Sequence, residues 1–134
     1  MASFNFTESP NTTAKVINTV TLTNNEFLSF PTFFLQQHHI REMGEEIGLK
    51  LFYDKENKAM AIQFMNGNET GLYKLNISDK YGATSKVRAF LLNNDLDVKK
   101  LAGKYEYKKY SATELGLDGS DVFVLNLSGG GEGM

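Results

Sequence analysis

The two histidines of the sequence, His38 and His39, are the residues best suited to acid–base or metal chemistry. Histidine titrates near neutral pH, and with a carboxylate such as Glu42 four residues further along a helix it can bind a metal ion. However, neighbouring residues on a helix point about 100° apart, so both imidazoles cannot easily bind one ion. The metalloprotease motif His-Glu-x-x-His is also absent. We therefore interpret the pair as part of a partly exposed face of a helix, and an enzyme that uses His38 or His39 is the least favoured alternative.

No other catalytic signature is present in the sequence. The chain has no cysteine, which excludes thiol catalysis and any zinc site built on cysteine. It also lacks the Gly-x-Ser-x-Gly elbow, the dinucleotide-binding glycine motif and the Walker loop. The glycines at 129–133 are terminal and are followed by no helix or lysine. We therefore expect a protein that is not an enzyme and has no cofactor and no metal site.

The basic residues are concentrated in one part of the sequence. From Lys74 to Tyr110 there are nine Lys or Arg and four Asp or Glu, a net charge of +5 in a chain whose total is −2. Several of these cations alternate with tyrosines, a pattern typical of proteins that stack bases on rings and contact phosphates with ammonium groups. The alternative interpretation is a set of solvated faces with tyrosines at the edge of the core. The candidate nucleic-acid-binding residues are Lys74, Lys80, Lys86, Arg88, Lys104, Tyr107, Lys108 and Lys109.

In the first half of the chain, the sequence predicts two strands, a helix and a hairpin. Residues 19–23 and 27–30 are extended runs separated by Asn24 and Asn25, which tolerate turns. Pro31 suits the first position of a helix, which we expect to continue to about Met43 and to end at Gly44. Two alternating strands, 49–53 and 59–64, then flank a polar turn.

The second half repeats this order of elements. A strand at 72–77 is followed by a helix that Thr84 or Ser85 could cap, and then by strands 104–110 and 121–127 joined by the loop 111–120. The two helices start about 50 residues apart. We therefore expect an α+β fold, a small and mostly antiparallel β barrel or sandwich with two short helices and a pseudo-duplicated strand-helix-hairpin unit.

Residues 16–127 are expected to form a single domain. The hydrophobic fraction of 41%, with 10 Phe and 6 Tyr, is enough for a core without disulfides. We expect residues 1–15 to be a flexible arm and the Gly-rich residues 128–134 to be a disordered tail. The predicted core consists of Leu22, Phe30, Ile40, Leu51, Ile62, Phe64, Leu75, Val87, Phe90, Leu91, Phe123 and Leu125.

Residues 18–65 resemble the swapped-hairpin DNA-binding proteins of the AbrB and MraZ type. The resemblance rests on Val20-Thr21-Leu22-Thr23, Leu28-Ser29-Phe30-Pro31 leading into a helix, Ile40 followed by Gly44-Glu45, and the hairpin from Leu49 to Phe64. The chain departs from the pattern after Pro31, where the family usually has a basic residue, and at Glu45, where it usually has Asp. The resemblance implies interleaved hairpins and DNA binding.

These features predict a small intracellular binding module. The chain has neither a signal-peptide pattern nor an apolar run of about 18 residues, so we expect a cytoplasmic protein with no membrane contact. The leading hypothesis is a regulator of transcription, of the kind a phage or mobile element encodes, that contacts nucleic acid through the basic Tyr/Lys surface. The alternative is a protein–protein adaptor or inhibitor that uses Phe33, Phe34 and the acidic first half. A homodimer is one option for its assembly.

Overall fold

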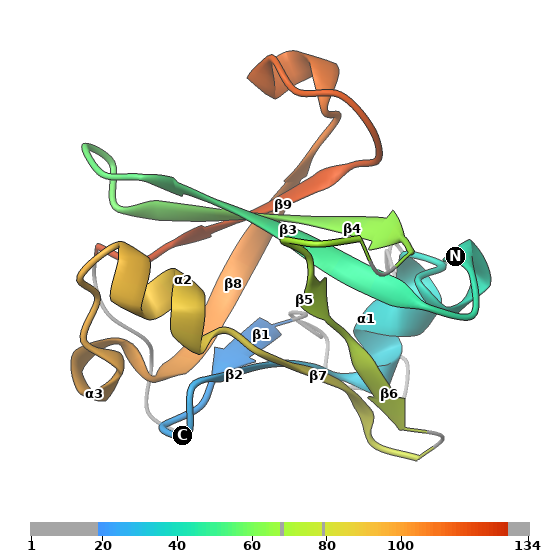
Figure 1. Ribbon diagram of the computed structural model, residues 1–134, viewed down its shortest axis with the longest axis horizontal. Coiled ribbons are helices and arrows are strands. Elements are labelled where there is room, and N and C mark those ends of the chain that lie inside the picture. Colours follow the sequence, from blue (N-terminus) through green and yellow to red (C-terminus); the bar gives the residue numbers. More distant parts are fainter. Residues whose placement is uncertain (1–18, 68, 79, 129–134) are drawn as a thin grey trace, which may run out of the picture.

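The computed structural model describes residues 19–67, 69–78 and 80–128. Mostly antiparallel strands form a nearly closed, barrel-like sheet, and this part of the chain also contains three short α-helices (Figure 1). The prediction of a small α+β barrel is confirmed at this level. The arm predicted at 1–15 and residues 129–134 of the predicted tail lie outside the described residues.

The elements fall into two successive halves. The first half contains β1 (Thr19–Leu22), β2 (Phe27–Phe30), α1 (Thr32–Gln37), the 3₁₀ turn η1 (Arg41–Met43), β3 (Ile47–Asp54) and β4 (Ala59–Asn66). The second half contains β5 (Tyr73–Lys74), β6 (Asn76–Ser78), β7 (Gly82–Lys86), α2 (Arg88–Asn93), α3 (Val98–Leu101), β8 (Gly103–Tyr110), the 3₁₀ turn η2 (Thr113–Leu115) and β9 (Val122–Asn126).

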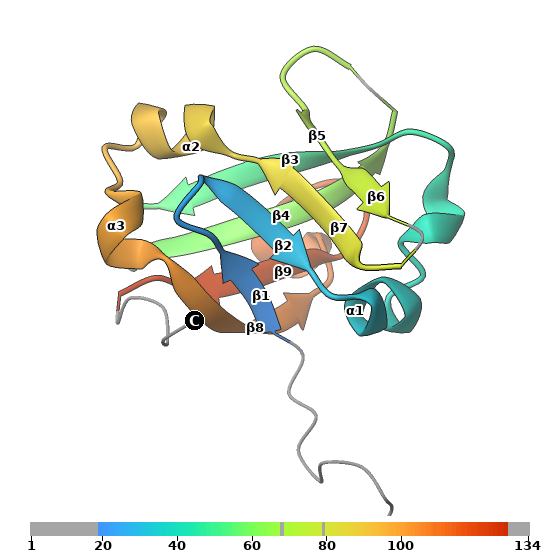
Figure 2. The same ribbon diagram turned by 90° about the horizontal axis from the view of Figure 1, so that it is seen from below.

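A single stretch of chain brings the two ends of the sheet together. The strand order is β5-β3-β4-β9-β8-β1-β2-β7-β6, and every neighbouring pair is antiparallel. Strands β5 and β6 are the first and last of this order, yet only Leu75 separates them along the chain. The Leu75 N–H donates to the Ile47 carbonyl at 3.0 Å. The sheet therefore curls until its ends nearly meet (Figure 2).

The core fills the barrel, and a helix lies at each of its two ends. Alternate strand residues point inward, as the two-residue period of a strand requires. The residues predicted for the core are buried, except that Leu51 is half-buried and packs against the core. Helices α1 and α2 lie at opposite ends of the barrel in both views (Figures 1 and 2). Each contributes a buried Phe-Leu pair, Phe34-Leu35 from α1 and Phe90-Leu91 from α2.

Both predicted helices are shorter than the sequence indicated. Helix α1 ends at Gln37 rather than near Met43, because His39 adopts a left-handed φ of 54°. The chain then turns back, and the Ile40 N–H donates to the Leu35 carbonyl at 3.0 Å, which leaves Ile40 buried. Burial of a large aliphatic side chain outweighs the continuation of a helix that no glycine or proline interrupts.

The predicted start of the second helix is also wrong. Thr84 and Ser85 belong to β7, and α2 begins only at Arg88, after Val87. The third helix, α3, was not predicted. Its cap is Asp97, whose side chain accepts a hydrogen bond from the Lys99 N–H at 3.0 Å.

The two halves share one spacing from the helix to the long strand that follows it. α1 and α2 begin at residues 32 and 88, and β3 and β8 begin at 47 and 103, so both offsets are 56 residues. Asp95 lies 56 residues after His39 and has the same φ of 54°. The Leu96 N–H donates to the Leu91 carbonyl at 2.9 Å, as the Ile40 N–H does to Leu35. Both helices therefore end in the same turn.

The strands of the two halves are interleaved. Hairpins β1–β2 and β3–β4 form within the first half, and β6–β7 and β8–β9 within the second. The other four pairings, β2–β7, β4–β9, β1–β8 and β3–β5, all join one half to the other. If β5 and β6 are counted as one strand that corresponds to β1, exchanging the halves maps this set of pairings onto itself.

Candidate nucleic-acid interface

Three of the predicted cations line one groove. The groove has a volume of about 750 Å³ and lies between β5, with the loop before it, and the end of β7 with α2. Its cations are Lys74 from β5, Lys86 from β7 and Arg88 from α2, and none of the described residues that line it is acidic. We call it the basic groove. Its positive lining makes it a candidate site for a polyanion.

The basic groove exists because one strand changes partners. β6 pairs with β7 only as far as Asn76 opposite Thr84. The residues just before β6 pair instead with β3, where Lys74 of β5 lies opposite Gly48. Figure 1 shows this diagonal course from β6 to β5. The end of β7 and β5 diverge as a result, and the cations stand on both sides of the opening.

The cations of the groove are only loosely engaged by the protein. Arg88 is 62% exposed, and its Nε lies 4.0 Å from Oε1 of Glu26. Such a long surface ion pair is worth little. The Lys86 Nζ lies 5.7 Å from the centre of the Phe27 ring, a distance that allows a cation–π contact. Lys74 and Lys86 are both exposed, so all three groups can reach a phosphate.

Apolar side chains accompany these cations. Leu92 is 63% exposed and lies four residues after Arg88, so both share one face of α2. Tyr73 is half-buried on β5, and burial raises the pKa of its phenol, which therefore stays neutral and can donate a hydrogen bond. The sequence pattern did not single out Leu92, although an exposed leucine four residues from an arginine on a short helix is the signal that could have found it.

The other predicted cations lie elsewhere. Lys80 lies in the turn between β6 and β7, where its N–H donates to the Ser78 Oγ at 3.2 Å. Lys104 and Lys108 are exposed on β8 and alternate with the inward-facing Tyr105. In the sheet, β1 and β2 lie between β8 and β7. The eight candidate residues are therefore not gathered on one surface.

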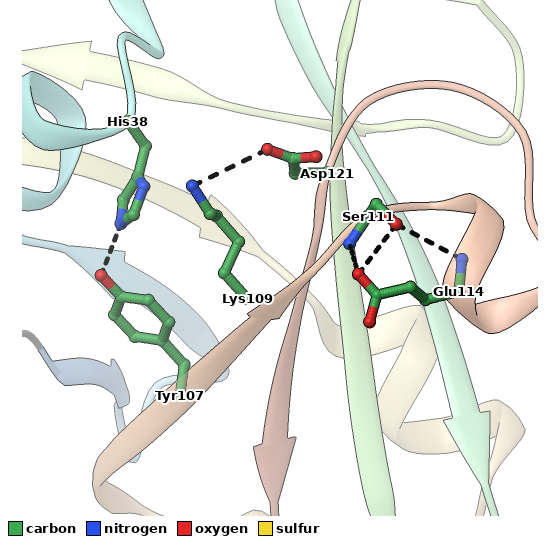
Figure 3. Close-up of polar contacts among 6 residues, drawn as sticks. All are labelled: His38, Tyr107, Lys109, Ser111, Glu114 and Asp121. Atoms are coloured by element: carbon green, nitrogen blue, oxygen red, sulfur yellow. Dashed lines mark hydrogen bonds and ion pairs between the residues drawn. The ribbon is translucent and has the colours of Figure 1, made fainter.

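Tyr107 does not have the exposed position that base stacking requires. Its ring centre lies 5.0 Å from that of Phe34 and 5.5 Å from that of Phe123. Its hydroxyl lies 2.5 Å from Nε2 of His38 (Figure 3). The alternation along β8 points Tyr107 inward, so the prediction of an exposed stacking tyrosine is wrong. Lys109, also expected at the interface, lies 3.9 Å from the Asp121 carboxylate instead.

The histidines are not on a helix, contrary to the expectation. His38 follows the last residue of α1, and the exposed His39 has its Nδ1 3.3 Å from a carboxylate oxygen of Glu42. Among the described residues, no cluster of three or more His, Asp or Glu side chains could hold a metal ion.

Comparisons with known protein families, curated proteins and solved structures find no match. The function must therefore be inferred from the residues of this chain. In the part of the chain that the structure describes, no helix is both long enough and apolar enough to span a membrane.

Proposed function

We propose that this chain is a non-enzymatic module that binds nucleic acid in the basic groove. The observation that carries the proposal is the convergence of Lys74, Lys86 and Arg88 from three separate elements on a groove whose described lining includes no acidic residue. Phosphate contacts supply most of the sequence-independent affinity for nucleic acid, and three cations placed together can neutralise successive phosphates.

Single strands are the preferred ligand in this proposal. The apolar surface of Leu92 and the ring of Tyr73 lie beside the cations in the groove. The unpaired bases of a single strand can turn toward such a surface while its phosphates face the cations. A duplex keeps its bases stacked inside and gains only the phosphate contacts.

The interleaved halves support a regulatory role for the module. Each hairpin of one half pairs with strands of the other, the arrangement implied by the resemblance of residues 18–65 to swapped-hairpin DNA-binding proteins. The common spacing of 56 residues supports duplication of one strand-helix-hairpin unit. The proposal therefore includes a transcription regulator that acts in the cytoplasm, with a phage or mobile element as its source.

A protein partner is the second candidate function. Phe33 is 50% exposed on α1, and an exposed phenylalanine on a helix is typical of a contact surface. Phe34, which the sequence had placed at the same contact, is fully buried. Only Phe33 of that pair supports this alternative.

Fluorescence anisotropy with labelled single- and double-stranded oligonucleotides tests the proposal. At about 50 mM salt we expect binding of both forms, tighter for the single strand, with a steep loss at about 200 mM. Lys86→Ala should weaken binding whatever the base sequence and lower the salt slope by about 0.7 for the single strand and about 0.9 for the duplex. Lys108→Ala, on the outer face of β8, is the matched control and should change binding less. Absence of binding at about 50 mM would reject the proposal and favour a protein partner.

A further inference from the structure

A second pocket lies at the α1 end of the barrel. Its volume is about 350 Å³, within the range of small-molecule sites. The end of α1, η1, β4 and the facing ends of β8 and β9 form it. Phe64 and Phe123, whose ring centres are 5.7 Å apart, provide an aromatic floor, and Ile40 and Met43 extend its apolar lining. We call this the α1 pocket.

One wall of the α1 pocket carries His38, Lys109 and Asp121. Nε2 of His38 is engaged by the Tyr107 hydroxyl at 2.5 Å, and within the described part of the chain Nδ1 has no hydrogen bond. Figure 3 shows Nδ1 on the side of the ring that faces the Lys109 ammonium. The Lys109 Nζ lies 3.9 Å from Oδ2 of Asp121, too far for a good hydrogen bond, so its donors are not saturated.

The loop between β8 and β9 holds this wall in place. It folds over the outer face of β4, where the buried Gln63 side chain donates to the carbonyls of Asp118 at 2.7 Å and Ser120 at 2.8 Å. The Ser120 hydroxyl donates to the Phe64 carbonyl at 2.5 Å. Asp121 is the next residue after Ser120. These hydrogen bonds therefore fix the position of the backbone that carries Asp121 into the pocket. The pocket is therefore largely preformed.

The position equivalent to Lys109 carries no cation in the other half. Fifty-six residues separate Tyr53 from Lys109 and His38 from Asn94. The Tyr53 ring packs edge-on against Phe90, with centres 6.0 Å apart. The Asn94 amide donates to the Phe90 carbonyl at 2.9 Å. At these two positions the α2 end has a phenol ring and an amide already used in a hydrogen bond. The lysines that line the pocket at that end, Lys58 and Lys100, come from other positions.

We infer that the α1 pocket binds a small organic carboxylate with an apolar body. The carboxylate would meet the Lys109 ammonium and Nδ1 of His38, and the apolar part would lie on Phe64 and Phe123. The proposal assigns the Tyr107 hydroxyl as the donor to Nε2, so that Nδ1 carries the proton and donates to the ligand. Asp121 orients the ammonium from the side, and a charge-assisted contact to a carboxylate is stronger than this long ion pair.

This site is independent of the basic groove, with which it shares no lining residue. If the protein failed to bind nucleic acid, the proposal for the α1 pocket would still stand. With a carboxylate in the α1 pocket, the protein would sense or carry a small metabolite in addition to binding nucleic acid in the basic groove.

A titration followed by two-dimensional NMR, with benzoate as the probe, tests the inference. We expect saturable shifts at the signals of His38, Lys109 and Phe123, with a dissociation constant on the order of 1 mM for so small a ligand. Benzyl alcohol and benzylamine, which keep the ring but lack the carboxylate, should bind at least about tenfold more weakly.

Two variants separate a specific site from general affinity for anions. Lys109→Met keeps the length of the side chain and should weaken benzoate binding by about tenfold or more. Lys108→Met is the matched control, because this neighbour is exposed on the opposite face of β8, and it should leave benzoate binding unchanged. The inference would be overturned if benzoate gave no saturation up to about 20 mM, if benzylamine or benzyl alcohol bound as tightly, or if Lys109→Met had no effect.

Discussion

The two halves of the molecule share a backbone frame but differ in the side chains that fill it. At the α1 end, the Phe34 ring is in contact with the rings of five residues, Phe30, His38, Phe64, Tyr107 and Phe123. At the α2 end, the Phe90 ring is paired with Tyr53. The shared turn requires only a buried Phe-Leu pair and an aliphatic residue five positions after the leucine. The remaining positions differ, with an aromatic pocket at one end and a basic groove beside the other.

The largest expected difference between the halves is in stability. Phe34→Ala removes a ring from a cluster in which each aromatic pair adds about 0.5–1.5 kcal/mol beyond burial. We expect this substitution to lower the free energy of unfolding by about 4–5 kcal/mol, and Phe90→Ala by about 3 kcal/mol. Urea denaturation measures both. A loss for Phe90→Ala equal to or larger than that for Phe34→Ala would show that the aromatic cluster adds nothing beyond ordinary burial.

The second difference is a pH dependence that belongs to the α1 end. Burial lowers the pKa of His38 from its ordinary value of 6.5, and Lys109 and His39 lower it further, while Asp121 opposes them. The unfolded chain therefore binds the proton more readily. As the pH falls below 6.5, stability should decrease until the folded-state pKa is reached, by about 1.4 kcal/mol per unit of lowering.

Denaturation curves between about pH 7.5 and 5.5 check this expectation. His38→Gln should flatten the dependence over that interval. The matched variant, His39→Gln, alters an exposed side chain that is the smallest cause of the lowered His38 pKa, and it should retain most of the dependence. Equal slopes for the protein and for His38→Gln would contradict the role given to the half-buried imidazole.

The smallest expected effect tests what the halves share. His39 and Asp95 both adopt a φ of 54°, a conformation that costs most side chains about 1–2 kcal/mol and glycine nothing. Because glycine also gains entropy in the unfolded chain, we expect His39→Gly and Asp95→Gly each to stabilise the protein by about 0.5 kcal/mol, as measured by thermal unfolding. If one variant were stabilised and the free energy of unfolding of the other fell by more than about 1 kcal/mol, the two turns would not be equivalent.

Much of the strand framework could be predicted from the sequence, because alternating polarity and turn residues such as Asn24 and Asn25 are local signals. The end of α1 could not be predicted from the sequence. No breaker precedes Gly44, and the turn at His39 is fixed by burial of Ile40, a tertiary contact. Strand alternation placed Tyr105 and Tyr107 on one face, but whether that face pointed inward depended on the barrel.

The basic groove was predictable only in part. The net charge of the segment from Lys74 to Tyr110 identified its cations, but not which of them would meet. Their convergence depends on the change of partner between β6 and β5, which is set by the Leu75–Ile47 hydrogen bond. A sequence pattern carries no information about such a long-range pairing.

The most direct test of the central claim is the salt dependence of single-strand binding in two triple variants of equal net charge. One replaces Lys74, Lys86 and Arg88 of the basic groove by Ala, and the other replaces the exposed Lys99, Lys100 and Lys104. We predict that the groove variant loses about two units of slope in a plot of log K against log salt, since each single-strand phosphate contact contributes about 0.7, while the second variant keeps the slope of the unmodified protein. Equal slopes in the two variants would contradict a binding site in the basic groove.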